Sequence, residues 1–267
     1  MPESLSKREP KLSTASPVPW DQNYMNLYTP VPNDGLAISD DGMDASLKIT
    51  GTNQSFGHFQ SKNRFMFGYF SMFIKLIPNE SAGVIATYYF SSPETKNQRH
   101  HYLKFDPTAD FHKYSLLWNQ HLIIWFVDNK VIRVFHNVSN ETGVPYPVGK
   151  PLAIQCSIWD GGEWATQGGR VKLNYSYAPF VVHYEGFDGV HGCQACPASP
   201  VTACDNKTEF PECYDSDKYW FLHQEEPTKR QIEQLKKHHR KYIVYDYCQD
   251  RMRFPSGLPD ECQFNSY

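Results

Sequence analysis

Apolar residues along this chain recur in short runs broken by turn residues, not at helical spacing. Between Trp20 and Phe187 the runs are ASLKIT, FGYFSMFIKLI, GVIATYYF, HKYSLLW, LIIWFVDNKVIRVF, LAIQCSIW and RVKLNYSYAPFVVHYEGF. Runs of this length, without helical patterns between them, predict an antiparallel β-sandwich or barrel. Asp128 and Asn129 separate two apolar arms, so we expect a hairpin that turns at this pair.

A helical pattern occurs only near the C-terminus. Pro227 and Thr228 suit a helix start, and Ile232, Leu235 and Tyr242 then fall near one face at helical spacing. A tail of this size cannot bury a core alone, so we expect it to dock on the sandwich.

Length and composition agree with one large domain and a small appendage. We expect a disordered leader over residues 1–19, a β-sandwich domain over 20–190 and a Cys-rich C-terminal extension over 191–267. The formal net charge of -3 offers no basic excess for nucleic acid, and no segment approaches a membrane span. The 17 Phe, 17 Tyr and 6 Trp residues fit either a β-rich core or a groove that stacks on sugars.

Six of the seven cysteines crowd the last third of the chain and predict a disulfide framework, hence an oxidising compartment. Cys248 and Cys262 close the final loop. The remaining four allow three pairings: Cys193, Cys196, Cys204 and Cys213. The CQAC motif raises zinc as an alternative, but no second pair follows at matching spacing, so we expect neither metal nor cofactor. Cys156 lies in an apolar strand pattern and is expected to be a buried free thiol.

Glycosylation sequons agree with secretion. Six asparagines begin N-x-Ser or N-x-Thr: Asn53, Asn79, Asn137, Asn140, Asn174 and Asn206. The first 20 residues are polar and lack the apolar core of a signal peptide. The alternatives are a secreted protein whose signal peptide is not part of this sequence and an intracellular one whose disulfides would form poorly. We favour the first.

Several long motifs then resemble one plant family. DFHKYSLLWNQHLIIWFVDNKVIRVF and IWDGGEWATQGGRVKLNYSYAPF resemble the xyloglucan endotransglucosylase/hydrolases, of glycoside hydrolase family 16 type. YDYCQDRMRFPSGLPDEC is similar to that family's C-terminal extension, and WDQNY and SAGVIATYYFSS to its opening strands. The resemblance implies an all-β, concanavalin-like jelly-roll sandwich with a small disulfide-bonded, helix-containing extension. It also implies a monomer in the apoplast or cell wall that cuts and rejoins the β-1,4-glucan backbone of xyloglucan by a retaining mechanism.

The resemblance also implies substrate-binding positions: Tyr89, Trp159, Glu163, Trp164, Gly168 and Arg253. Trp159 and Trp164 correspond to an aromatic platform on which glucose rings stack. Tyr89 corresponds to a tyrosine of the cleft and Arg253 to an arginine of the tail. Arg99 is a weaker candidate for an arginine that the family places just before the YL pair.

The family's catalytic strand has no counterpart here. The family places its nucleophile, a helper Asp and its acid/base on one strand as E-x-D-x-E, because residues i, i+2 and i+4 point to one face. Only PETKNQRHH separates ATYYFSS from YLKFDPT, so about 30 residues, or two to three strands, are missing. The acids that could replace the motif show no such spacing: Glu94, Asp106, Asp110, Asp160, Glu163, Asp215 and Asp217. We therefore expect no catalytic residues.

Two adjacent histidine pairs, His100-His101 and His238-His239, are expected to be surface polar residues, because neighbours in a strand or helix diverge. Three interpretations stay open. The chain is an ordinary transglycosylase whose catalytic segment is missing from this sequence, a non-catalytic β-glucan-binding wall protein, or a misfolded by-product with exposed sheet edges.

Overall fold

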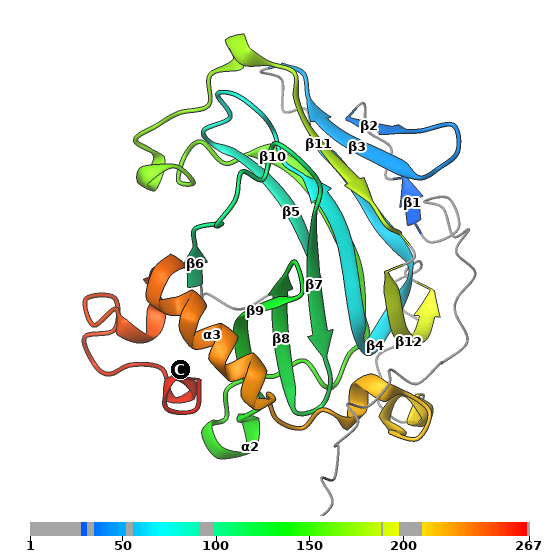
Figure 1. Ribbon diagram of the computed structural model, residues 1–267, viewed down its shortest axis with the longest axis vertical. Helices are drawn as coiled ribbons and strands as arrows, with labels where there is room; N and C mark the ends of the chain where they lie inside the picture. Colours follow the sequence, from blue (N-terminus) through cyan, green and yellow to red (C-terminus); the bar gives the residue numbers. More distant parts are fainter. Residues whose placement is uncertain are drawn as a thin grey trace, which may run out of the picture.

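One long strand, β4 (Gly57–Lys75), runs through the middle of the molecule and belongs to two layers (Figure 1). The computed structural model describes residues 28–30, 35–51, 56–90, 99–187, 189–197 and 210–265, so the expected leader lies outside the described residues. β4 bends at Phe67 and Gly68, which have φ values of 64° and 157°. A Cβ at Gly68 would lie 2.4 Å from the ring of Phe70, so the bend requires glycine there.

The two halves of β4 pair with different neighbours. In the described chain, its C-terminal half continues the strand order β2 (Leu36–Ile38), β3 (Asp44–Ile49), β11 (Phe180–Glu185), β4, β7 (His112–Trp118), β8 (Leu122–Val127) and β9 (Lys130–His136). Its N-terminal half pairs with β1 (Tyr28–Pro30), β12 (Val190–Pro197) and β10 (Leu152–Asp160), and β10 pairs with β5 (Val84–Phe90). All these pairings are antiparallel, and the predicted jelly-roll sandwich is confirmed.

The core between the layers is largely aromatic. Phe59 of β4 meets Tyr184 of β11 edge to face with ring centroids 5.3 Å apart, and both side chains are fully buried. The Tyr184 hydroxyl crosses to the other layer and donates to the Thr87 carbonyl at 3.1 Å. Cys156 is buried among these residues as a free thiol, as expected.

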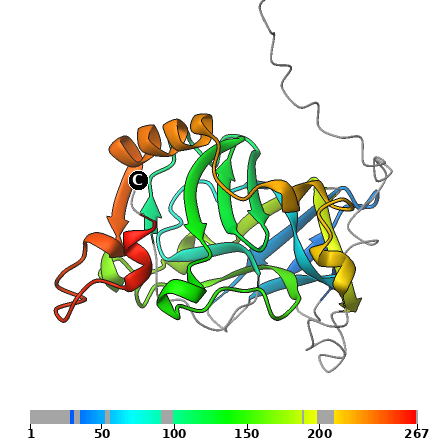
Figure 2. The same cartoon turned by 90° about the horizontal axis from the view of Figure 1, so that it is seen from below.

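The C-terminal helix α3 (Lys229–Tyr242) lies over the outer face of β8 and β9 (Figures 1 and 2). It begins where the sequence predicts: Thr228 and Gln231 form a reciprocal capping box. Leu235 is fully buried in a cluster with apolar residues of the strands beneath, among them Leu122 and Ile124. No helix in the described part of the chain is long and apolar enough to cross a bilayer.

Disulfides tie the extension together. Cys193–Cys213 joins β12 to the 3-10 helix η5 (Pro211–Tyr214), and Cys248–Cys262 closes the tail loop as predicted. Cys196 is also disulfide-bonded, while Cys204 lies outside the described residues. The remaining short elements are β6 (Arg99–His101), α2 (Ser139–Thr142), η1 (Gln167–Gly169), η2 (Tyr175–Tyr177), η6 (Trp220–His223), β13 (Ile243–Asp246), η7 (Tyr247–Gln249) and η8 (Asp260–Gln263).

The β8–β9 turn and the segment before β11 compare differently with their sequence predictions. The β8–β9 hairpin turns at Asp128 and Asn129, whose φ values of 47° and 60° suit a tight two-residue turn, so this prediction is confirmed. The run RVKLNYSYAPFVVHYEGF is not one strand. Residues 171–178 form a loop with a 3-10 turn, and β11 begins at Phe180, because Pro179 removes a backbone donor.

Candidate functional site

β5 and β10 form a polar face on the side away from the core. Outward residues pair across the two strands: Ile85 with Trp159, Thr87 with Ser157, and Tyr89 with Gln155. Their neighbours in sequence point inward, because strand residues alternate between faces. Cys156 and Ile158, for example, are fully buried.

Hydroxyl and amide side chains on this face are held by one another. The Thr87 and Ser157 hydroxyls lie 2.6 Å apart, and the Ser157 backbone N–H donates to Thr87 Oγ1 at 2.9 Å. Gln155 contacts the ring of His58 on β4 and donates to Gln60 at 3.4 Å. Such groups can exchange hydrogen bonds with sugar hydroxyls, but none of them is a carboxylate.

The loop after β10 carries the second tryptophan of the predicted platform. The rings of Trp159 and Trp164 lie 6.0 Å apart and tilt by 46°, and Trp164 is 52 % exposed. The Gly161 N–H donates to the Gly83 carbonyl at 2.8 Å, which fixes the loop to the start of β5. The structure therefore brings Trp159 and Trp164 together at one end of the polar face.

Asp160 organises this loop. Its carboxylate accepts from the Gly162 N–H and from the Tyr175 hydroxyl, both at 2.7 Å. Partial burial, with the Asp160 carboxylate beside it, raises the pKa of Tyr175 to about 12. Asp160 thus holds the loop through both of its oxygens.

Glu163 and Gly168 lie farther along the same loop. Glu163 is exposed and pairs with Lys172 at 3.0 Å. Gly168 has a φ of 68° and Gly169 one of 83°, and a Cβ at Gly169 would lie 2.0 Å from the Glu163 carbonyl oxygen. The two glycines are needed for this turn, which returns the chain beside Trp164.

Tyr89 and Arg253 lie apart from the tryptophans. Tyr89 is 45 % exposed and pairs opposite Gln155, about 13 Å along the strands from Trp159 at ~3.3 Å per residue. Arg253 belongs to the tail loop. Its guanidinium donates to the Tyr245 hydroxyl at 3.2 Å and its backbone N–H to Asp250 at 3.0 Å.

The remaining acids have structural contacts. Asp106 accepts from the Thr108 N–H and hydroxyl, which hold the pKa of Asp106 below its ordinary value. Asp215 accepts from the N–H of Asp217 in a turn. Burial, with Asp44 nearby, raises the pKa of Glu185, but this acid is on β11 in the other layer. Glu94 lies outside the described residues.

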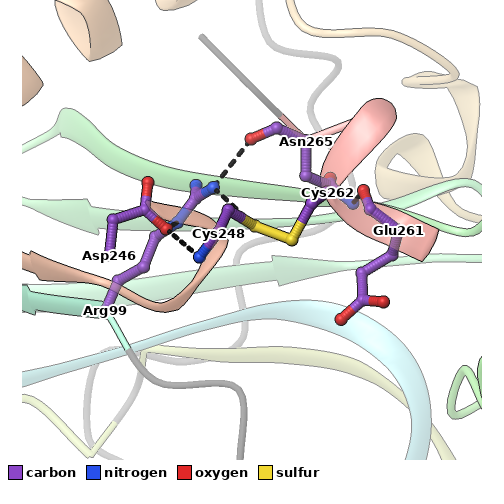
Figure 3. The surroundings of a disulfide bond; sticks show 6 residues. All are labelled: Arg99, Asp246, Cys248, Glu261, Cys262 and Asn265. Atoms are coloured by element: carbon purple, nitrogen blue, oxygen red, sulfur yellow. Dashed lines mark hydrogen bonds and ion pairs between the residues drawn. A yellow bond between two sulfur atoms is a disulfide. The ribbon is translucent and has the colours of Figure 1, made fainter. Parts of the chain in front are cut away.

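Arg99 is an anchor within the protein. Its side chain is 2 % exposed, lies 3.0 Å from Asp246 and donates to the Asn265 carbonyl at 2.8 Å, beside the Cys248–Cys262 disulfide (Figure 3). Because the guanidinium is enclosed by the extension, it is not available to substrate on the polar face.

The expectation that the histidine pairs are surface residues is wrong for the members that face each other. His101 of β6 and His238 of α3 lie 3.1 Å apart between ring nitrogens, and His239 is buried against the Ile132 carbonyl. Burial, with His238 and His239 beside it, lowers the pKa of His101 to about 3. Sequence separation concealed this cluster, because β6 and α3 meet only in the tertiary fold.

The asparagines of the predicted glycosylation sequons differ in exposure. Asn79, Asn140 and Asn174 are exposed, whereas Asn137 Nδ2 donates to the Gln120 carbonyl at 2.7 Å. Asn53 and Asn206 lie outside the described residues.

Among the described residues, one group brings potential metal ligands together, Cys193, Glu212 and Cys213, and its two cysteines are joined in a disulfide.

The family profiles and the curated relatives agree in lineage. The profile for Glycosyl hydrolases family 16 matches residues 26–100 and 90–177, and that for the xyloglucan endo-transglycosylase (XET) C-terminus matches 213–262. Xyloglucan endotransglucosylase/hydrolase protein A of Phaseolus angularis is 34 % identical over 280 positions, covering 92 % of this chain and 88 % of that protein. Xyloglucan endotransglucosylase protein 6 of Diospyros kaki is 35 % identical, with 83 % of each chain covered. The solved Bacillus licheniformis β-glucanase overlaps 66 % of this chain and 96 % of its own, at 15 % identity and a TM-score of 0.47.

Proposed function

This chain belongs to the xyloglucan endotransglucosylase/hydrolase family, and from that premise we propose that it binds the β-1,4-glucan backbone of xyloglucan without cutting it. The observation that carries the proposal is the β5–β10 face, which pairs hydroxyl and amide groups with the Trp159–Trp164 platform. Indole faces stack on the apolar faces of glucose rings, and the polar groups meet the sugar hydroxyls.

Retaining glycosidase chemistry needs two carboxyl groups about 5–5.5 Å apart, one as nucleophile and one as acid/base. The side chains that point outward on described β5 and β10 before the loop are Ile85, Thr87, Tyr89, Gln155, Ser157 and Trp159. None of these can attack an anomeric carbon as a carboxylate does. We therefore expect no turnover from the chain as given.

Two features of the comparisons support the loss of a segment after β5. The alignment with the Phaseolus angularis protein runs over 280 positions, more than the 267 residues of this chain, so some positions of that protein have no counterpart here. The family 16 profile also matches in two pieces that overlap at residues 90–100. This overlap coincides with the short connector that replaces the expected E-x-D-x-E strand.

We assign the protein to the apoplast or cell wall as a monomer. The disulfides Cys193–Cys213 and Cys248–Cys262 support an oxidising compartment, and Asn79, Asn140 and Asn174 are exposed for glycosylation.

The test combines a binding and a transfer measurement on the purified full chain. Calorimetry with xyloglucan should give saturable binding, and incubation with xyloglucan and a labelled oligosaccharide acceptor should give no labelled polymer. Trp164→Ala should weaken binding roughly tenfold, because one stacked ring is lost. The matched control is Tyr177→Ala, since Tyr177 is equally exposed at 52 % but lies on η2. Labelled polymer would overturn the loss of chemistry, and absent binding would overturn the binding function.

A second candidate is an active transglycosylase made from a longer product of the same gene. The split family match at residues 90–100 favours it. Sequencing the transcript across the codons for Phe90 to Tyr102 distinguishes the two candidates. A transcript with an in-frame E-x-D-x-E segment supports the active enzyme, and finding the short transcript alone rules it out.

A further inference from the structure

A cavity of about 770 Å³ lies between β5 and the strands β7 to β9. β5 contributes Tyr88 and Phe90 to its wall, and the opposite layer contributes Leu116, Trp118 and Trp125. The layer that contains β7, β8 and β9 is wider than the layer that contains β5. One edge of β5 pairs with β10, and no described strand pairs with its other edge, so the cavity lies beside that edge. Ligand pockets in proteins commonly have a volume of this order.

The wall is mainly apolar and carries three buried hydroxyls without a hydrogen-bond partner among the described residues, those of Tyr88, Tyr114 and Ser115. Tyr88 and Tyr114 both line the cavity, and neither hydroxyl has a hydrogen-bond partner in the described part of the chain. They belong to opposite layers, Tyr88 to β5 and Tyr114 to β7. Burial raises the pKa of Tyr88 well above its usual value and that of Tyr114 to about 12, so both hydroxyls keep their protons and can donate. A buried donor without an acceptor is costly, so an oxygen-bearing ligand would relieve both.

A cation also faces this space. The Arg133 guanidinium lies 4.8 Å from the ring centre of Trp125, and both residues line the cavity. A cation stacked on an indole favours an electron-rich ring or oxygen nearby. By contrast, a sugar would need many more hydrogen-bonding groups than this wall provides. The cavity thus differs in chemistry from the hydroxyl- and amide-rich face on the other side of β5.

We propose that this cavity binds a planar aromatic molecule whose oxygen substituents accept hydrogen bonds from Tyr88 and Tyr114. The aromatic and aliphatic side chains enclose the ring, and the two hydroxyls set its orientation. Even an apolar cavity of about 150 Å³ can bind benzene, so this volume accommodates a fused two-ring compound. Tyr88 and Tyr114 point to the interior, so the site lies on the opposite side of β5 from the glucan face, and Tyr89 lies at the border of the two.

The probes are 2-naphthol and naphthalene, which differ by one hydroxyl, titrated calorimetrically into the full chain. We expect saturable binding of 2-naphthol with a Kd below roughly 100 μM. Tyr88→Phe and Tyr114→Phe should each raise that Kd roughly three- to tenfold, because one donor is lost, and leave the naphthalene Kd unchanged. Tyr177→Phe, at an exposed tyrosine outside the cavity, should change neither.

A filling variant completes the test. Ala86 lines the cavity, so Ala86→Phe should abolish binding of both probes while thermal unfolding remains cooperative. Three outcomes overturn the proposal: no saturable binding to the unmodified chain, equal loss of both probes in the Phe variants, or undiminished binding in Ala86→Phe. Xyloglucan binding by the same samples is an independent readout, so the failure of one proposal is distinguishable from that of the other.

Discussion

The two halves of the sandwich differ in how completely their layers cover each other. Where β3 and β11 face β4 and β10, residues from both layers are fully buried, for example Leu47, Phe59 and Ile158. Where β7, β8 and β9 extend past β5, several inward residues that line a cavity are only half-buried, for example Leu116, Ile123 and Phe135. The outer face of the same strands is closed by α3 around Leu235. An apolar strand pattern therefore predicts a face that must pack against another element. The path of the chain determines whether such an element lies against it.

The sharpest test of this comparison truncates one phenylalanine in each half. Phe59→Ala in the complete half should lower the free energy of unfolding by about 3–5 kcal/mol, because a well-packed site cannot collapse around the loss. Phe135→Ala beside the cavity should cost only about 1–2 kcal/mol, since fewer contacts are lost. Urea unfolding monitored by circular dichroism measures both. Equal costs would contradict the contrast between the halves.

The cover supplied by α3 can be tested in the same way. Leu235→Ala should cost about 2–4 kcal/mol, since Leu235 is fully buried against β8 and β9. The neighbouring exposed Lys236→Ala is the matched control and should change stability by less than about 0.5 kcal/mol. A small effect of Leu235→Ala would mean that the helix contributes little to the stability of these strands.

Replacing an alanine by phenylalanine should raise the free energy of unfolding in one half of the sandwich and lower it in the other. Ala86→Phe adds contacts inside the cavity and should stabilise by about 1 kcal/mol. Ala45→Phe in the fully packed half should destabilise by about 1–3 kcal/mol through overpacking. Melting temperatures of the two variants measure the signs, and a destabilised Ala86→Phe would show that the cavity cannot accept a side chain.

A further test concerns acid and the histidine cluster beneath α3. His101 has a folded pKa of about 3, below its usual 6.5, so the unfolded chain binds more protons between these values. The contribution of uncharged His101 to the free energy of unfolding is therefore complete above pH 6.5. It falls as the pH drops toward 3, by at most about 1.4 kcal/mol per pH unit for one group. Partial exposure of the cluster, which includes His238, reduces this figure.

The measurement is the melting temperature between pH 7.5 and 5, above the titration of ordinary carboxylates. His101→Gln should flatten the curve. His121→Gln serves as a control, because His121 is exposed at the start of the β8 strand and lies outside the cluster. An unchanged slope in His101→Gln would locate the acid sensitivity elsewhere.

The elements that depend on neighbouring residues could be predicted from the amino-acid pattern. The apolar runs predicted β3, the C-terminal half of β4, β5 and β7 to β10. Asp128 and Asn129 predicted the hairpin turn, and Thr228 predicted the start of α3. These follow from side-chain alternation, turn conformation and capping, each of which involves neighbours within a few residues. The family resemblance predicted Trp159 and Trp164 as neighbours, and their rings do lie 6.0 Å apart, only five residues apart in sequence.

Contacts between segments that are distant in the chain became visible in the folded protein alone. The fold placed Arg99 against Asp246, His101 against His238, and Tyr88 across a cavity from Tyr114. No pattern in the sequence announces such contacts, because they join elements that are up to 147 residues apart. Whether a hydrophobic face becomes core, cavity or ligand site is set by which strands of the opposite layer the chain supplies, and that is a property of the whole fold.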